Sequence, residues 1–206
     1  EAVRSKDPQK LESIMVQLYK QARERDGEVG SIEVTDTKGI ILMRGHNPSK
    51  YGDDKSKTPL FAKALSTKKV QRGIEVSSTT GLLSLESVAP VFSGTDFVGL
   101  IKVGSYPSSE NLFDLKRFLD AEVAIITKSE KPISQEIESK YQIKTKYYPN
   151  EKLLVYGATF PHDVAADFIR SHGDFSGVLS ISGQLFFGKR FEITAGDEVH
   201  HDLGLL

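Results

Sequence analysis

One short segment, Arg44-Gly45-His46-Asn47-Pro48, followed closely by Tyr51, carries the densest set of chemically active side chains in this sequence. It combines a guanidinium, an imidazole, an amide and a phenol. An arginine can bind a carboxylate through two parallel, charge-assisted hydrogen bonds, and the nearby polar groups can orient such a ligand. The segment therefore predicts a small-molecule site. The ligand-binding residues predicted here are Arg44, His46, Asn47 and Tyr51.

Polar residues also interrupt two apolar segments that read as strands. Ser84 and Glu86 share one face of the first, and Lys102 and Tyr106 share one face of the second, because side chains two apart on a strand point the same way. Such residues either face water or line a pocket, and the sequence does not set which face is buried. If Glu86 and Lys102 both face inward, they could bind the ammonium and carboxylate of an amino acid, or neutralise each other.

The loop allows a second interpretation. Arg44 could pair with Asp53, Asp54 or Glu86, in which case the loop would be solvated and would bind nothing.

The residues near the end of the sequence include several potential metal ligands, because His200-His201-Asp202 follows Asp197 and Glu198. Adjacent histidines on a strand point to opposite faces, so we expect solvated side chains and no metal. No Gly-x-Ser-x-Gly, phosphate-binding glycine loop or His-Glu-x-x-His motif occurs, and we expect neither an enzyme nor a cofactor.

Composition narrows the class of protein. The chain has 206 residues, enough for one large domain or two modules of about 100 residues. A formal net charge of −1 gives no basic surface for nucleic acid, and the absence of cysteine excludes disulfides and thiolate chemistry. The longest apolar runs are far shorter than the roughly 20 residues of a membrane-spanning helix. Because the sequence begins at Glu1 without a signal peptide or an initiator methionine, we expect a fragment of a longer protein.

The apolar periodicity predicts an α+β fold. A long amphipathic helix is expected from Pro8 to about Arg25, and a β-hairpin is expected over 31–43. A loop and a short helix then lead to three strands in meander order. The elements expected after the hairpin are a helix from Pro59 to Leu65, strands over 71–77, 82–92 and 96–106, and a helix over 110–121 capped by Ser108 and Ser109.

The remaining sequence predicts a smaller copy of the same plan. Its expected elements are strands over 122–127, 153–159, 177–182, 184–194 and 199–205, and helices over 134–141 and 163–171.

Four segments carry a resemblance to a known family. The segments 34–39, 43–48, 87–92 and 98–105, which read VTDTKG, MRGHNP, SVAPVF and VGLIKVGS, resemble double Cache sensor domains. These are similar to PAS folds and form the extracytoplasmic part of many methyl-accepting chemotaxis proteins, sensor histidine kinases and diguanylate cyclases. The specific motifs lie between about residues 31 and 121, and the second half matches by element order alone.

The resemblance implies an organisation and a function. Residues 1–27 would form an N-terminal stalk helix, 28–121 a membrane-distal ligand-binding module, and 122–206 a smaller membrane-proximal module. The implied function is sensing of a small organic acid or amino acid by a region outside the inner membrane, with signal transduction through flanking membrane segments and homodimerisation through the N-terminal helix. The alternatives are a cytoplasmic PAS-type domain that holds a cofactor or associates with proteins, and a stand-alone α+β binding protein or enzyme.

Overall fold

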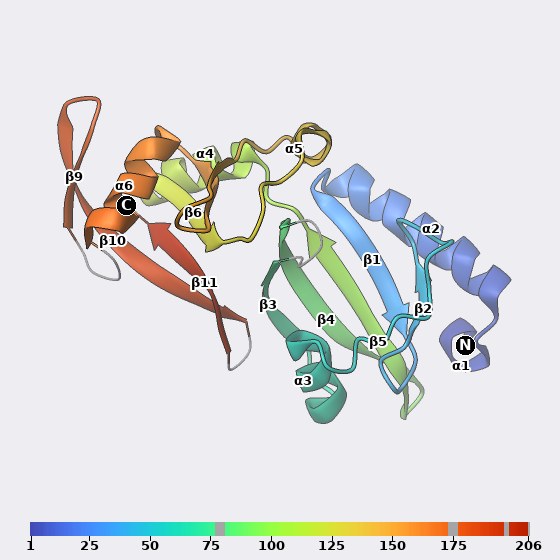
Figure 1. Ribbon diagram of the computed structural model, residues 1–206. Coiled ribbons are helices and arrows are strands. Elements are labelled where there is room, and N and C mark those ends of the chain that lie inside the picture. Colours follow the sequence, from blue (N-terminus) through green and yellow to red (C-terminus); the bar gives the residue numbers. More distant parts are fainter. Residues whose placement is uncertain (77–80, 173–176, 196–197, 206) are drawn as a thin grey trace. The chain divides into compact units, whose positions relative to one another are not determined.

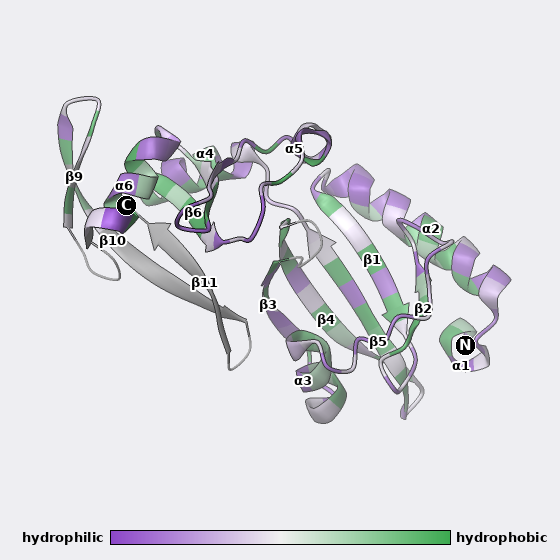
Figure 2. Cartoon of the chain, in the orientation of Figure 1, coloured by the Kyte–Doolittle hydropathy of each residue, from purple (hydrophilic) through white to green (hydrophobic). Residues whose placement is uncertain are grey.

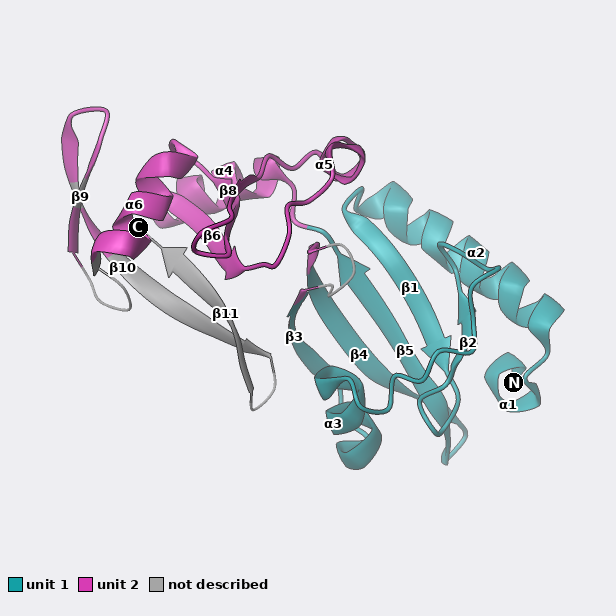
Figure 3. Cartoon of the chain, in the orientation of Figure 1, with its two compact units in different colours: residues 1–75, 84–106, 195–198 teal, residues 76–83, 107–194, 199–206 magenta. Residues whose placement is uncertain are grey.

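The computed structural model describes residues 1–76, 81–172, 177–195 and 198–205 (Figure 1). The chain has an α+β fold that divides into two compact units, each built on its own sheet (Figure 3). Unit 1 contains residues 1–75 and 84–106, and unit 2 contains most of the remaining residues. The α+β class with mainly antiparallel sheets is therefore confirmed.

Unit 1 is a five-stranded sheet with the strand order β2-β1-β5-β4-β3. Its pairs β1–β2, β1–β5 and β4–β5 are antiparallel, so the first hairpin is joined to the later meander through β5. The strands are β1 (Val29–Thr35), β2 (Ile41–Arg44), β3 (Gln71–Val76), β4 (Leu83–Ser93) and β5 (Asp96–Ser105).

The long helix α2 (Pro8–Arg25) covers one face of this sheet, alongside β1 and β2 (Figure 1). The Asp7 side chain caps it by accepting a hydrogen bond from the Lys10 amide, and Pro8 occupies the first turn, where its missing N–H costs no hydrogen bond. Leu11 and Met15 are buried against the sheet. A short helix that the periodicity does not indicate, α1 (Ala2–Ser5), precedes it.

Gly45 directly follows β2 and lies against the backbone of α2. A Cβ atom at this position would lie 2.2 Å from the Met15 carbonyl oxygen, so only glycine fits. The missing side chain thus admits the backbone of α2.

The opposite face of the sheet is covered by α3 (Pro59–Thr67) over part of its area. Leu60, Phe61 and Ala64 of this helix pack against Val88 and Leu100. Leu100 and its neighbour Ile101, which packs on the α2 side, point to opposite faces, as alternation along a strand requires. Both faces of the sheet therefore carry buried side chains.

Unit 2 is a six-stranded sheet with helices α4 (Ser109–Leu119), α5 (Gln135–Tyr141) and α6 (His162–His172). Ser108 and Asn111 form a reciprocal capping box at the start of α4. The strand order is β7-β8-β6-β11-β10-β9. The strands are β6 (Val123–Lys128), β7 (Lys146–Tyr148), β8 (Leu153–Ala158), β9 (Gly177–Ile181), β10 (Gln184–Ala195) and β11 (Glu198–Leu205). Of these, only the three-residue β7 has no counterpart in the sequence interpretation.

Within the ranges that the structure describes, no helix is both long and apolar enough to cross a bilayer.

Candidate functional site

The face of the unit 1 sheet that lies beside α3 carries polar side chains where a core would normally be apolar. In β4, Ser84 and Glu86 are buried, whereas Leu85 between them is 47% exposed. In β1, all seven residues are buried, including Ser31 and Glu33. Figure 2 shows the result as hydrophilic segments within otherwise hydrophobic strands of this sheet. This polarity is the reverse of the usual arrangement, in which apolar residues face inward.

The buried side chains of this face form an ion-pair network. Lys102 donates a hydrogen bond from Nζ to Glu86 Oε1 at 2.9 Å, and the same Nζ lies 3.5 Å from Glu33 Oε2. Ser84 Oγ donates a second hydrogen bond to Glu86 Oε1 at 3.0 Å. The Lys102, Glu33 and Glu86 side chains are each less than 10% exposed. Arg44, Ser31 and Glu75, which are described below, belong to the same group. The charged cluster is therefore defined as Ser31, Glu33, Arg44, Glu75, Ser84, Glu86 and Lys102.

Arg44 is the second cation of the charged cluster, and each of its three guanidinium nitrogens donates a hydrogen bond within the chain. Its Nε donates to Glu33 Oε1 at 3.0 Å, and one terminal nitrogen donates to the Lys50 carbonyl oxygen at 2.6 Å. The other terminal nitrogen donates to Asp53 Oδ2. The pairing with Asp53 was one of the alternatives in the sequence analysis. Arg44 therefore ties the loop after β2 to the sheet.

The pKa values follow from burial and from these partners. Burial raises the pKa of Glu33, but Lys102 and Arg44 together lower it more, and the net pKa is below the ordinary value. Burial lowers the pKa of Lys102, but Glu86 and Glu33 raise it more, and the net pKa is raised. Glu75 differs, because burial and the negative charge of Glu86 raise its pKa to about 7. At neutral pH, Glu33 and Lys102 are thus charged while Glu75 is partly protonated.

Several buried oxygen atoms of the charged cluster have no hydrogen-bond partner among the described residues: Ser31 Oγ, Glu33 Oε2, Glu75 Oε1 and Glu86 Oε2. Gly104 lies beside them, where a Cβ would be 2.6 Å from Ser31 Oγ and 3.6 Å from Glu86 Oε1. The missing side chain at Gly104 lets these groups converge. An unpaired buried acceptor is unfavourable by about 1–3 kcal/mol, so these oxygen atoms lack hydrogen bonds that would stabilise them.

The structure brings four of the predicted site residues together in the charged cluster: Arg44, Ser84, Glu86 and Lys102. Tyr106 lies near it, because its phenol is among the groups that act on the Lys102 charge, and its ring packs against Gly30.

Asn47 and Tyr51 lie away from the charged cluster, whereas His46 is near enough for the charges of Glu33, Lys102 and Arg44 to act on it but has other contacts. His46 faces α2, with Nδ1 3.4 Å from the Ile32 carbonyl oxygen and its ring 6.0 Å from the Tyr19 ring. Asn47 is exposed and accepts a hydrogen bond from Ser49 Oγ at 2.8 Å, and Tyr51 is 67% exposed.

The sequence interpretation did not include Ser31, Glu33 and Glu75. Ser31 and Glu33 alternate with apolar residues in β1, a pattern typical of a strand with one wet face. The signal that could have found them is the pairing of β1 with β5, which places Glu33 directly opposite Lys102. Strand pairing of this kind cannot be predicted from a single sequence.

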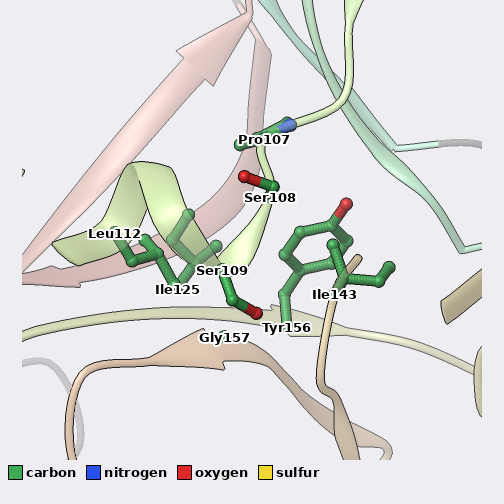
Figure 4. Close-up of a pocket in the computed structure, with 8 residues that line it drawn as sticks. All are labelled: Pro107, Ser108, Ser109, Leu112, Ile125, Ile143, Tyr156 and Gly157. Atoms are coloured by element: carbon green, nitrogen blue, oxygen red, sulfur yellow. The ribbon is translucent and has the colours of Figure 1, made fainter. Parts of the chain in front are cut away.

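Unit 2 contains a shallow depression beside α4. Figure 4 shows its mainly apolar lining, with Leu112, Ile125, Ile143 and Tyr156. It has no room for a water-sized molecule, so we do not assign a ligand to it.

Metal binding has no support in the described residues, which contain no group of three or more potential ligands. The side chains of His200, His201 and Asp202, considered in the sequence analysis, lie outside the described part of the chain, as does Asp197.

Comparison with solved structures identifies the fold. A domain of a protein described as belonging to the sensory box/GGDEF family of Vibrio parahaemolyticus matches with a TM-score of 0.50 and 16% identity, over 99% of this chain and 80% of that chain. The sensor domain of the histidine kinase DctB from V. cholerae matches with a TM-score of 0.48 and 12% identity, over 75% of this chain and 80% of that one. The ligand-binding domain of the Pseudomonas aeruginosa PAO1 amino acid chemoreceptor PctC, solved with GABA, matches with a TM-score of 0.47 and 16% identity, over 93% and 79%.

Each match is a domain of a bacterial sensory or receptor protein, and this chain has the Cache-type fold that the motifs resemble. No protein-family model and no curated protein matches the sequence.

Proposed function

We propose that the chain is the extracytoplasmic sensing region of a bacterial transmembrane receptor, and that it binds a small organic acid or amino acid at the charged cluster of unit 1. The observation that carries the proposal is the set of buried, unpaired oxygen atoms around Ser31, Glu86 and Gly104. A protein that needed only a stable core would place apolar residues there, because an ion pair is often no more stabilising than well-packed apolar side chains. A ligand that forms hydrogen bonds with these unpaired oxygen atoms would explain why polar residues are buried at these positions.

The position of the charged cluster also supports a role in signalling. Glu33 and Arg44 lie on β1 and β2, the two strands that α2 contacts. At Gly45 the helix backbone touches the strand without an intervening side chain. A ligand that shifts β1 or β2 must therefore shift α2, provided that it binds two conformations with different affinity.

The same helix is the proposed dimer contact in the full receptor. Ile14 and Leu18 lie one turn apart on α2 and are 40% and 39% exposed. Two large apolar side chains at this spacing form a seam that a second copy of the helix can cover. Attachment to the inner membrane, with this region in the periplasm, would then be made by segments beyond the present sequence.

A thermal-shift screen against small carboxylates, amino acids, amines, sugars and purines tests the function. A ligand at 100 times its Kd stabilises the folded state by about 2.7 kcal/mol, which should raise the Tm by about 5–10 °C. Ser31→Ala should leave the Tm of the free protein almost unchanged, because Ser31 Oγ has no partner to lose, but should reduce the shift.

Ser139→Ala, which changes an exposed serine of α5, is the matched control and should keep the full shift. A compound that shifts wild type and Ser31→Ala equally would place the binding site elsewhere, and no shift with any class would reject a small-molecule sensor.

A further inference from the structure

We propose that the ligand of the charged cluster carries a cationic amine, bound through the carboxylates of Glu33 and Glu86 and the hydroxyl of Ser31, and that a ligand carboxylate is not required. This inference rests on the proposed function and narrows its ligand class. It retains amino acids, adds simple primary amines, and removes organic acids without an amine.

The charges of the cluster are the first argument. Four carboxyl groups, those of Glu33, Glu75, Glu86 and Asp53, lie around Arg44 and Lys102, and the charge of Lys55 also acts on Glu33 and Glu75. Glu75 is only partly ionised at neutral pH. The net charge of these groups is still slightly negative, which attracts a positive ligand.

The unpaired atoms are the second argument. Glu33 Oε2, Glu75 Oε1 and Glu86 Oε2 are carboxyl oxygen atoms without a hydrogen-bond partner, and Ser31, which is 2% exposed, offers a hydroxyl oxygen. An ionised carboxylate only accepts hydrogen bonds, and Glu75 can donate one, to Glu86, only in its protonated form. A bound group must therefore supply several donors at once, and an ammonium supplies three.

The state of the two cations is the third argument. A ligand carboxylate needs donors, and each guanidinium nitrogen of Arg44 already donates to Glu33, the Lys50 carbonyl or Asp53. Lys102 Nζ is held by Glu86 at 2.9 Å with Glu33 at 3.5 Å. An anion that bound either cation would therefore lie beside the carboxylates that already pair with it. The Lys102 ammonium instead shows which chemical group these carboxylates accept.

A divalent metal ion is the other cation that carboxylates attract. The described residues contain no set of three potential metal ligands arranged around one point. The geometry therefore favours an organic cation.

Three probes of equal chain length test the inference: n-pentylamine, pentanoate and 5-aminopentanoate, each at millimolar concentration in a thermal-shift assay. The expected result is a rise in Tm of several degrees with n-pentylamine and 5-aminopentanoate, and none with pentanoate. Glu86→Gln should abolish the rise. Glu12→Gln, an exposed glutamate of α2 in the same unit, should keep it. Circular dichroism of each free variant establishes that it is folded.

A rise with pentanoate and none with the amine would overturn the amine inference and leave small-molecule sensing at this cluster in place. The same holds if the broader screen finds only anionic or neutral ligands. A rise with Ca²⁺ or Mg²⁺ but not with n-pentylamine would also overturn it. If neither these probes nor the screen gives any shift, both the inference and the proposed function fail.

Discussion

Lys102 and Glu86 form a buried diagonal pair across two neighbouring strands. Lys102 stands opposite Val88, and Glu86 stands opposite Gly104, yet Lys102 Nζ lies 2.9 Å from Glu86 Oε1. The diagonal contact is possible because Gly104 has no side chain to fill the space between them. Lys102 also contacts Glu33 on the other neighbouring strand, so one ammonium joins β1, β5 and β4.

Removing the Lys102 ammonium should therefore destabilise the protein. In Lys102→Met, Glu33 and Glu86 lose their shared cation and remain buried, and we expect a loss of about 3 kcal/mol in unfolding free energy at pH 7. The loss should shrink towards pH 5, because uncompensated buried carboxylates take up protons at higher pH than paired ones. Urea unfolding at both pH values measures this. Lys20→Met, at an exposed position of α2, should change stability by less than about 0.5 kcal/mol. Equal stability of the two variants would mean that the pair contributes nothing.

Glu75 should make stability depend on pH. Its pKa is about 7 in the folded protein against an ordinary value of 4.5, owing to burial and Glu86. Between these values the folded state binds more protons than the unfolded state, so this contribution is fully present below about pH 4.5 and is lost as the pH rises through 7. Lys102 and Lys55 also act on Glu75 and oppose the shift.

Glu75→Gln removes this proton, so the variant should lose less stability than wild type between pH 5 and 8. Because Glu75 is partly exposed, we expect a difference of about 1–2 kcal/mol. Unfolding free energies across this range give the slope, and Glu12→Gln is again the control. Identical slopes for Glu75→Gln and wild type would show that Glu75 titrates normally.

The contact between Gly45 and α2 predicts a sharp difference between two glycines. Gly45→Ala would place a Cβ 2.2 Å from the Met15 carbonyl oxygen and should destabilise by about 1–3 kcal/mol. Gly27→Ala places its Cβ in open space and should change stability by less than about 0.5 kcal/mol. Chemical denaturation of both variants tests whether α2 and β2 are in direct backbone contact, and a neutral Gly45→Ala would argue against it.

Much of the fold was predictable because local patterns determine it. The periodicity of Leu11 and Met15, with Pro8 at the start, predicts a helix from Pro8 to about Arg25, and α2 spans Pro8–Arg25. The turn residues between the strands give the order of the meander. The short elements α1 and β7 were not found, because four and three residues are too few to show a period.

The charged cluster was only partly predictable, for a different physical reason. Ser84, Glu86 and Lys102 are visible as polar interruptions of apolar strands, but their burial depends on which face of the sheet is covered. Glu33 alternates with apolar neighbours and therefore has the pattern of a solvent-facing residue until β1 is paired with β5. Arg44 was predicted as a ligand-binding residue from its loop, whereas its contacts with Glu33 and Asp53 come from tertiary structure that a single sequence does not contain.

The most direct test of the proposed binding site is an amide NMR titration of the ¹⁵N-labelled protein with the most stabilising compound from the screen. Our account predicts that the largest shift changes occur at Ser31, Glu33, Glu86, Lys102 and Gly104, on three strands of unit 1, with smaller changes in β6 and β8 of unit 2. Changes concentrated in unit 2, or confined to exposed residues such as Tyr51, would contradict binding at the charged cluster.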